Sequence, residues 1–428
     1  MSERRVVITG MGLVTPLGLG ADDFWTALVQ GRSAVTRVNL AGDSQQARHL
    51  AAPVPPFNVR SYVPDRKLLR IMSRTAQFGL AAAQMAVSDS GEASVHTSRK
   101  GAFIGTGQAL CPGEFLFDAV RASRDDSGEI STRLLGSHGV SLIPPLSMLL
   151  ALSNGCLYAS SVLHSISGSN TNFLSSGDAA LAAIGEAYWA VREGEVDWAL
   201  AGGYDGGVNR WAHADFYRLG MLSSHTSNPA RAVRPFDRSR DGFALGEGAG
   251  MVVLEEQRAA AARGARVWGE ILGFAATCDA AGPLTPRADG SALAAAALGA
   301  LRDGGIEPSD VDYVNAYASA TPVGDQTELR ALETAFGGLR RRPLVSGIKG
   351  AIGHLLAASG AVELGAALLS LRHQLVPPTL NLEAPDPECH FDCVPNQARP
   401  AAVSIALTIN RGIGGQNAAM VLRRAETS

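Results

Sequence analysis

The sequence has little lysine, no strong charge of either sign and no long uncharged apolar run. Only three of its 37 basic residues are lysines, which we interpret as a bias in genomic composition rather than as chemistry. The formal net charge of −3 gives no electrostatic reason to expect nucleic acid or an anionic membrane as a partner. No uncharged apolar run reaches the roughly 18–20 residues that a membrane span needs. A membrane protein is therefore not predicted.

Cysteine is also scarce. The five cysteines, at positions 111, 156, 278, 389 and 393, are odd in number and mostly scattered, which favours a reducing cytoplasm as the location. The first residues, MSERRVVITGMG, pass directly from charge into a strand-like segment, without the apolar core of a signal peptide. We therefore expect a cytoplasmic protein.

A dinucleotide fingerprint is absent as well. Residues 5–10 are a predicted buried strand, and GMGLVTPLGLG after it is expected to be a glycine-rich loop. The fingerprint G-x-G-x-x-G needs a glycine where Thr15 stands. No cofactor is predicted from this segment or from any other.

What is present is a strand–turn–helix–strand pattern over residues 170–203. A β-prone piece leads into the small polar turn Ser175-Ser176-Gly177-Asp178, and an Ala-rich helix then runs to Arg192. Gly194 stands where a helix stop belongs. Many α/β enzymes expose a nucleophile at the start of such a helix. Here the tip of the turn offers two serines and a glycine.

The rest of the chain alternates strand and helix patterns, which predicts an α/β fold. We expect two similar halves, residues 1–257 and 258–428, each with long alanine-rich helices packed against sheet. The segment at about 108–152 is irregular and interrupts the first half. A single body with loops is predicted rather than domains joined by flexible linkers.

Several separated segments together resemble the β-ketoacyl-acyl-carrier-protein synthases of the thiolase-like superfamily. They are VVITGMGLVTPLG, RPFDRSRDGFALGEGAGMVVLEE, VNAYASATPVGDQTEL, SGIKGAIGHLLAASGAVE, TLNLEAPDP and NRGIGGQNAAMVL, in the family's order and spacing. The resemblance covers essentially the whole chain. It implies a thiolase-like fold with duplicated halves in a layered αβαβα arrangement.

In that family a cysteine at the helix N-terminus carries the acyl chain, and two histidines help to decarboxylate the extender and hold the thioester oxygen. The resemblance places the cysteine at Gly177 and the first histidine at Tyr317, so both are lost here. The second histidine is kept as His354, and the family's lysine as Lys349. No intact catalytic set is therefore predicted.

Other family positions are also kept or changed. Asp325 and Glu328 fall where the family keeps acidic residues near its lysine. The C-terminal gating loop reads INRGIGG, so its two phenylalanines become Arg411 and Ile413. The gate of the pocket is therefore expected to differ from that of active synthases.

Loss of the cysteine makes the sequence similar to chain length factors of type II polyketide synthases. The resemblance implies a non-catalytic subunit that forms a heterodimer with an active ketosynthase and works on chains carried by an acyl carrier protein. In this branch glutamine commonly replaces the cysteine, so Gly177 is a departure. Retention of His354 and Lys349 suggests a branch that makes reduced, polyene-type chains.

The resemblance also suggests where chain length is set. In chain length factors a helix within 111–122 closes the tunnel along the dimer interface, which makes Phe115, Asp118 and Ala122 the candidate tunnel residues, with Ile413 at the gate. An ordinary interface helix is the alternative. Residues around 154–175 are expected to be buried against the partner.

Alternative functions remain open at this point. The chain could be a competent variant synthase or a malonyl decarboxylase that uses His354, or a structural pseudoenzyme without influence on chain length. Ser176 is a weaker candidate nucleophile, because it lies one position early and needs a base. Cys389 and Cys393, with His390 between them, resemble half of a metal site on a surface connection, and no metal is predicted.

Overall fold

The computed structural model describes residues 4–40, 49–63, 65–91, 93–107 and 113–425. Two sets of five strands form the framework. The first set is β1 (Val6–Thr15), β5 (Lys100–Thr106), β6 (Asn170–Leu174), β7 (Trp198–Gly206) and β8 (Leu245–Glu256). The second is β9 (Gly269–Cys278), β10 (Tyr313–Asn315), β11 (Leu344–Ser346), β14 (Ile405–Arg411) and β15 (Gln416–Arg424).

The two sets have the same topology. Their spatial orders are β1-β8-β7-β5-β6 and β9-β15-β14-β10-β11, so the first strand of each set lies beside its fifth, then its fourth, second and third. In both sets the first two pairings are antiparallel and the last two are parallel. Antiparallel pairing of β1 with β9 joins the halves. The expected duplication is confirmed.

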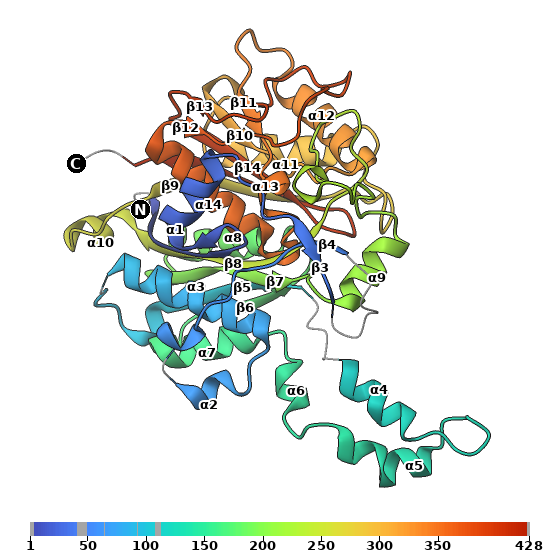
Figure 1. The fold of residues 1–428 in the computed structure, drawn as a ribbon. Coiled ribbons are helices and arrows are strands. Elements are labelled where there is room, and N and C mark those ends of the chain that lie inside the picture. Colours follow the sequence, from blue (N-terminus) through green and yellow to red (C-terminus); the bar gives the residue numbers. More distant parts are fainter. Residues whose placement is uncertain (1–3, 41–48, 64, 92, 108–112, 426–428) are drawn as a thin grey trace.

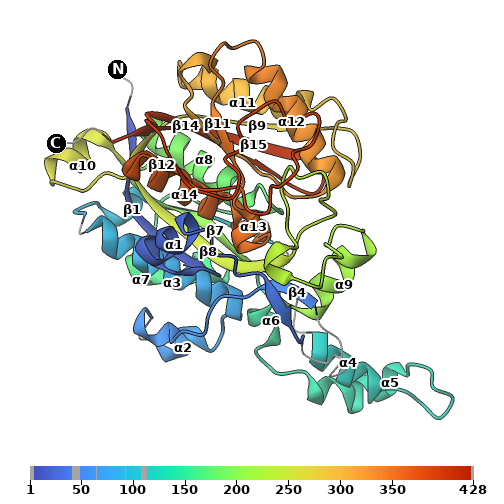
Figure 2. The same ribbon diagram turned by 45° about the horizontal axis from the view of Figure 1, so that its top comes forward.

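The helices form three layers around these strands (Figures 1 and 2). Helices α3 (Arg74–Ser90) and α7 (Gly155–His164) cover one outer face, and α11 (Ser291–Asp303) and α12 (Pro322–Phe336) cover the other. Between the two sets of strands lie α8 (Ala179–Arg192) and α14 (Ser359–His373), whose apolar side chains form the centre of the core. The layered αβαβα arrangement is thus confirmed.

Smaller elements complete the described chain. Outside residues 113–152, the remaining α-helices are α1 (Gly20–Val29), α2 (Arg66–Leu69), α9 (Arg210–Arg218), α10 (Gln257–Ala262) and α13 (Lys349–Ile352). The short strands are β2 (Gly18–Leu19), β3 (Thr36–Val38), β4 (His49–Ala52), β12 (Leu375–Val376) and β13 (Arg399–Pro400). Within the described ranges, no helix combines the length and apolarity that crossing a membrane would require.

The glycine-rich segment after residue 10 is not the predicted loop but the second half of β1. A Cβ atom on Gly10 would lie 2.0 Å from the carbonyl oxygen of Ala86, and one on Gly12 would lie 2.0 Å from that of Ala82. Both carbonyls belong to α3, so the glycines let strand and helix backbones approach closely. The prediction of a loop is therefore wrong, because these glycines serve close packing of β1 against α3.

Two helix boundaries leave short loops before long helices. Helix α2 ends at Leu69, and Ser73 caps the start of α3 through its side chain. Helix α14 begins only at Ser359, so His354 lies in the preceding loop. That loop lets His354 bridge to Leu245 in β8 and point its ring at the site described next.

The segment 113–152 extends from the body as an arm (Figure 1). It carries α4 (Gly113–Arg121), which agrees with the helix that the resemblance implied within 111–122. It also carries α5 (Thr132–Ser137) and α6 (Ser147–Leu150), where the sequence predicted an irregular segment. Phe117 of α4 stacks on Trp211 of α9 at 4.9 Å between ring centroids, which attaches the base of the arm to the body.

Candidate active site and its degenerate centre

The predicted nucleophile turn is present between β6 and α8. The chain leaves the sheet at Leu174, turns through Ser175–Asp178 and enters α8 at Ala179. Ser175 donates a hydrogen bond to Oδ1 of Asp178 at 2.8 Å, which holds the turn closed. Gly177 is buried at its tip. The layout of a nucleophile at a helix N-terminus is therefore kept, without a reactive side chain.

Gly177 also lacks the space for a side chain. A Cβ atom built on it would lie 2.2 Å from the carbonyl oxygen of Arg411 and 3.2 Å from Cε2 of Tyr317. The first contact is far inside van der Waals distance and involves backbone, so a side chain here requires the end of β14 to move. The site therefore has neither the thiol that the resemblance leads one to expect nor the space for a cysteine side chain.

Tyr317 and His354 face each other beside Gly177. The Tyr317 hydroxyl lies 2.7 Å from Nε2 of His354, and the two rings meet edge to face at 5.4 Å. Phe243 packs on the other side of the imidazole, with 4.8 Å between centroids. The structure therefore brings together the two positions at which the resemblance places the family's histidines.

The hydrogen bonds of His354 define its protonation. The backbone N–H of Leu356 donates to Nδ1 at 2.9 Å, so the neutral ring carries its proton on Nε2 and donates it to the Tyr317 oxygen. Burial, together with the charge of Lys349, holds the pKa of His354 well below its ordinary value. Both ring nitrogens are therefore occupied by protein groups.

Lys349 is fully buried at the bottom of the site. Its ammonium group donates to Oε1 of Glu363 and to the backbone carbonyl of Tyr317. The same ammonium lies 4.1 Å from the centroid of the Tyr317 ring, a cation–π contact. Lys349 thus neutralises Glu363 and fixes Tyr317, which are structural tasks.

The two acidic residues expected near the lysine have separate partners. Glu328 accepts the backbone N–H groups of Tyr317 at 2.8 Å and Ala318 at 2.7 Å. Burial, with the charge of Asp325, raises the pKa of Glu328 to about 7. Asp325 instead accepts the backbone N–H groups of Phe236 and Ala320 and pairs with Arg240. Both carboxyl groups therefore shape the loop that carries Tyr317.

Arg411, at one of the two changed gate positions, points away from the turn. Its guanidinium group donates to Asp279 at 3.0 Å, Thr327 at 2.7 Å and Asn417 at 3.1 Å, and only 5% of the residue is exposed. The sequence does not predict Asp279 as part of the site. A buried arginine needs a counter-ion, so Arg411 in place of the family's phenylalanine indicates only that a carboxylate lies nearby.

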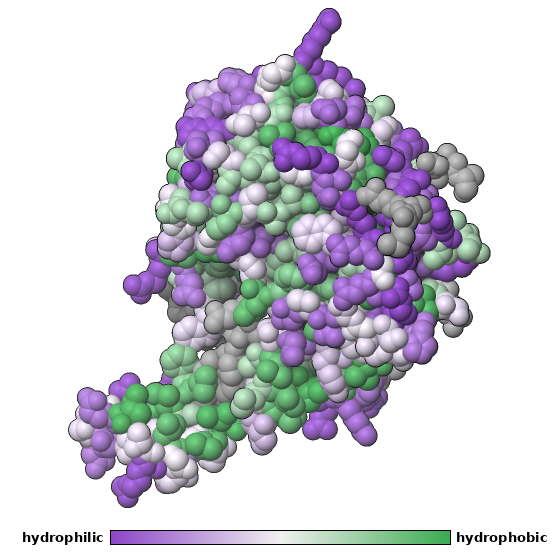
Figure 3. All heavy atoms as spheres, turned by 180° about the vertical axis from the view of Figure 1, so that it is seen from behind, coloured by the Kyte–Doolittle hydropathy of each residue, from purple (hydrophilic) through white to green (hydrophobic). Residues whose placement is uncertain are grey.

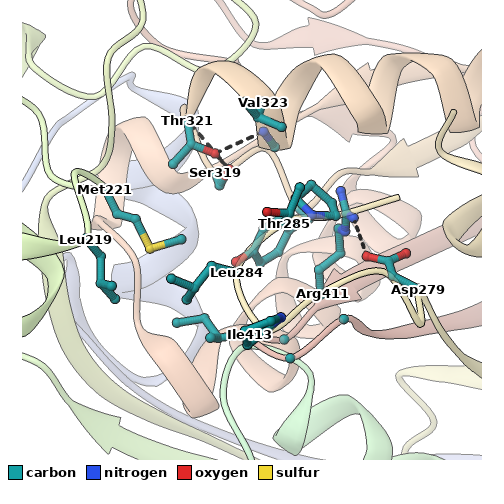
Figure 4. A pocket seen from close by; sticks show the side chains of 18 of the residues that line it. Leu219, Met221, Asp279, Leu284, Thr285, Ser319, Thr321, Val323, Arg411 and Ile413 are labelled. Carbon is teal, nitrogen blue, oxygen red and sulfur yellow. Dashed lines mark hydrogen bonds and ion pairs between the residues drawn. The ribbon is translucent and has the colours of Figure 1, made fainter. Parts of the chain in front are cut away.

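A pocket of about 380 Å³ opens next to this centre (Figure 4). Leu219 and Met221 lie on one side of it, and Arg411 with Asp279 on the opposite side. Ile413, at the other changed gate position, lies on the pocket wall and is 37% exposed. Tyr317 also lines this space, so a small ligand in the pocket can contact this residue.

Ser176 lies at the same turn but has a structural partner. Its Oγ accepts the backbone N–H of Ile413 at 2.6 Å. Within the described residues, no histidine or carboxylate hydrogen bond to Ser176 is observed that would activate it as a nucleophile. The bond to Ile413 instead fastens the turn to the gating loop.

The candidate tunnel residues lie on the arm. Asp118 has a side chain that is 62% exposed and faces Arg121 at 3.8 Å, and Ala122 is exposed just after the helix. The side chain of Phe115 lies outside the described part of the chain. Among the described residues of the body, none covers Asp118 or Ala122, so a tunnel at this place would need a wall from a second molecule.

The Cys389–Cys393 segment differs from the expected surface connection, because Cys393 is only 3% exposed. The two sulfur atoms lie 3.1 Å apart. His390 contributes its backbone carbonyl to Arg342. In the described ranges of the chain, no group of three or more histidine, cysteine or acidic side chains could hold a metal ion.

Comparison with known proteins identifies the family of the chain. The family model for the beta-ketoacyl synthase N-terminal domain matches residues 3–260, and that for the C-terminal domain matches residues 268–383. The chain is 33% identical to 3-oxoacyl-[acyl-carrier-protein] synthase 2 of Synechocystis sp. and 34% identical to that of Coxiella burnetii, over 99% of each chain.

Solved structures are similar over the whole chain. The structure titled the ishigamide ketosynthase/chain length factor superposes with a TM-score of 0.86 at 30% identity, covering 99% of this chain and 100% of the other. A chain from the structure titled as a type II PKS acyl-carrier protein in complex with its ketosynthase superposes with a TM-score of 0.84 at 29% identity, with the same coverage. The chain therefore belongs to the beta-ketoacyl synthase family and has its thiolase-like fold.

Proposed function

We propose that this chain is a chain length factor, a non-catalytic subunit that pairs with an active ketosynthase and helps to enclose the growing acyl chain. The observation that carries the proposal is the contact between Gly177 and the carbonyl oxygen of Arg411, 2.2 Å from where a Cβ would stand. A chain that cannot hold a nucleophile at this place depends on another subunit to carry the acyl group.

The state of the remaining side chains supports the same proposal. His354 donates its Nε2 proton to Tyr317, so this proton is engaged before any thioester oxygen arrives. Tyr317 cannot replace an imidazole as a base, because burial raises the pKa of its phenol still further above the ordinary value of 10. The centre is therefore organised as a packed hydrogen-bonded unit.

An unpartnered apolar surface supports the heterodimer. Exposed apolar side chains lie along the arm, which is the green projection in Figure 3, and also on α7 and at the end of β6. They include Val140, Met148, Tyr158, Val162 and Leu174, with exposures between 52% and 77%. Strand β6 is also an edge strand of the sheet in the described chain. Such a surface and edge suit a second copy of the same fold.

Similarity to the ishigamide ketosynthase/chain length factor and to a ketosynthase in complex with an acyl-carrier protein supports the choice of partners. We propose an active, cysteine-bearing ketosynthase as the second subunit and an acyl carrier protein as the carrier of substrate. The retained His354 and Lys349 are the basis for placing the chain in a branch that makes reduced, polyene-type chains.

Co-expression with the cysteine-bearing ketosynthase encoded nearest to this chain tests the proposal. We expect the two chains to co-purify in equal amounts and the pair to elongate acyl groups, whereas this chain alone does not. Val162→Asp and Leu174→Asp should abolish co-purification, because each places a charge in the apolar surface. Val323→Asp, at an exposed apolar position on the pocket wall, is the matched control and should leave assembly intact.

A malonyl-carrier decarboxylase is the second candidate, because the pocket gives a ligand access to Tyr317 and lies beside His354. The purified chain should be incubated with malonyl-loaded carrier protein. Decarboxylation by the wild-type chain that disappears in His354→Ala would establish this activity and overturn the non-catalytic reading. Absence of decarboxylation in both is the result that our proposal predicts.

A further inference from the structure

Two cysteines outside the degenerate centre form a close pair. The sulfur atoms of Cys389 and Cys393 lie 3.1 Å apart, at hydrogen-bond distance for thiols, and both cysteines are free. A disulfide bond is roughly 2.05 Å long, so an approach of about 1 Å separates this pair from a bond. The two residues are only four positions apart, and the turn between them already brings the side chains together.

The backbone holds both ends of this turn. The N–H of Cys389 donates to the carbonyl of Asp386 at 2.8 Å, and the N–H of Val345 in β11 donates to the carbonyl of Asp392 at 2.9 Å. On the far side, the N–H of Thr379 donates to the carbonyl of Val394 at 2.8 Å. These bonds make the proximity of the two thiols a property of the folded chain.

The two thiols have different surroundings. Cys389 is partly exposed, and its hydrogen bond with Cys393 lowers the pKa of Cys389. Cys393 is packed against the apolar core of the second half, and this hydrogen bond together with burial raises the pKa of Cys393 well above its ordinary value. A reactive outer thiol next to a protected inner thiol is the arrangement that thiol–disulfide exchange requires.

We propose that Cys389 and Cys393 are a reversible redox pair that closes to an intrachain disulfide by exchange with a small-molecule disulfide. The Cys389 thiolate attacks one sulfur of the external disulfide, forms a mixed disulfide and releases one thiolate. Cys393 gives up its proton, which the released thiolate accepts, and attacks the Cys389 sulfur. This step breaks the mixed disulfide and releases the second thiolate, which takes up from water the proton that Cys389 had lost. The chain is thus oxidised by two electrons and the external disulfide is reduced to two thiols.

The pair lies next to an anchor of α12. Glu388, which precedes Cys389, accepts from Arg330 at 2.9 Å and from Gln326 at 2.5 Å, and the first turn of α12 lines the pocket. Closing the disulfide therefore constrains the turn that carries this anchor. The proposal does not depend on the function of the pocket, because it rests on the thiols alone.

Mass spectrometry of the full chain tests the pair. The chain should be equilibrated with mixtures of reduced and oxidised glutathione, and free thiols then blocked with N-ethylmaleimide. We expect a species two hydrogen atoms lighter than the reduced chain that has lost two blockable thiols and regains them with dithiothreitol. The tryptic peptide over residues 373–411 contains both thiols and no other cysteine, so the bond can be located without a variant.

Variants complete the test. Cys393→Ser should stop the reaction at a glutathione adduct on Cys389, and Cys389→Ser should abolish both adduct and disulfide in this peptide. Cys278→Ser, which removes an exposed free cysteine elsewhere, is the matched control and should leave the disulfide unchanged. A wild-type chain whose 373–411 peptide keeps both thiols blockable in the most oxidising mixture, or holds only a glutathione adduct, would overturn the proposal.

Discussion

The hydroxyl oxygen of Tyr317 lies 2.7 Å from Nε2 of His354, so a phenol and an imidazole form a hydrogen bond at the two positions where the resemblance places the family's histidines. Because Nδ1 of the same ring accepts from Leu356, His354 has no free donor or acceptor. His354 is therefore a buried, fully hydrogen-bonded structural residue.

Tyr317→Phe should therefore destabilise the chain. The substitution removes the oxygen that accepts from His354 and leaves a buried N–H without a partner, at a cost of about 1–3 kcal/mol. Urea unfolding followed by fluorescence measures this loss. Tyr158→Phe, on an exposed ring, is the control and should change the free energy of unfolding by less than about 0.5 kcal/mol. Equal unfolding midpoints for Tyr317→Phe and wild type would show that the hydrogen bond is absent.

His354 should also make stability depend on pH. Its pKa is lowered in the folded chain, so below the ordinary value of 6.5 the unfolded chain binds a proton that the folded chain does not. Its contribution to stability is therefore present above this pH and lost as the pH falls. The loss is about 1.4 kcal/mol per pH unit for a single group.

Urea unfolding of wild type and His354→Gln at about pH 7.5 and about pH 5.5 measures this contribution. We expect the wild type to lose about 1 kcal/mol more than the variant over this interval. His138→Gln, at an exposed histidine, is the control and should follow the wild type. Parallel pH profiles for wild type and His354→Gln would mean that the ring is not held neutral.

Restoring the family's side chains should not restore the reaction. In Gly177→Cys/Tyr317→His the new Cβ still lies 2.2 Å from the Arg411 carbonyl oxygen, which is backbone and cannot rotate away. We expect no acyl-enzyme after incubation with acyl-loaded carrier protein, as intact mass would show. Gly177→Ala alone should cost about 1–3 kcal/mol of stability, whereas Gly338→Ala, where a Cβ meets nothing within 4 Å, should be nearly neutral. An acylated double variant would contradict this explanation of the loss of function.

The sequence predicted the fold and the meeting of Gly177, Tyr317 and His354, because motif order and spacing follow the topology. It did not predict the contact of Gly177 with the Arg411 carbonyl, since backbone approach leaves no residue pattern. Gly10 and Gly12 are a second case in which the sequence does not reveal a close approach of two backbone segments. Their pattern is shared by turns and by close strand–helix packing, and only the position of α3 decides between the two.

The buried pair of Arg411 and Asp279 offers a further prediction. Asp279→Ala leaves a guanidinium group that is almost fully buried without its counter-ion, which should cost about 3–5 kcal/mol. Asp279→Asn keeps hydrogen-bonding atoms and should cost less. Arg411→Met/Asp279→Leu removes both charges and should recover much of the stability of Asp279→Ala in urea unfolding. If the double variant is less stable than Asp279→Ala, the ion pair is not the main contribution of Arg411.

The exposed residues of the arm give the last prediction. Asp118 and Ala122 are exposed on the arm, and in the proposed heterodimer they would line the tunnel that limits the acyl chain. Ala122→Phe fills space and should shorten the products of the co-expressed pair. Asp118→Leu removes a charge that disfavours apolar chains, and should raise the yield of longer products. Arg133→Leu, on α5 of the same arm, is the control for a lost surface charge. Product masses that are the same in wild type, Ala122→Phe and Asp118→Leu would place the limit of chain length elsewhere, because a bulky ring in the tunnel cannot leave its length unchanged.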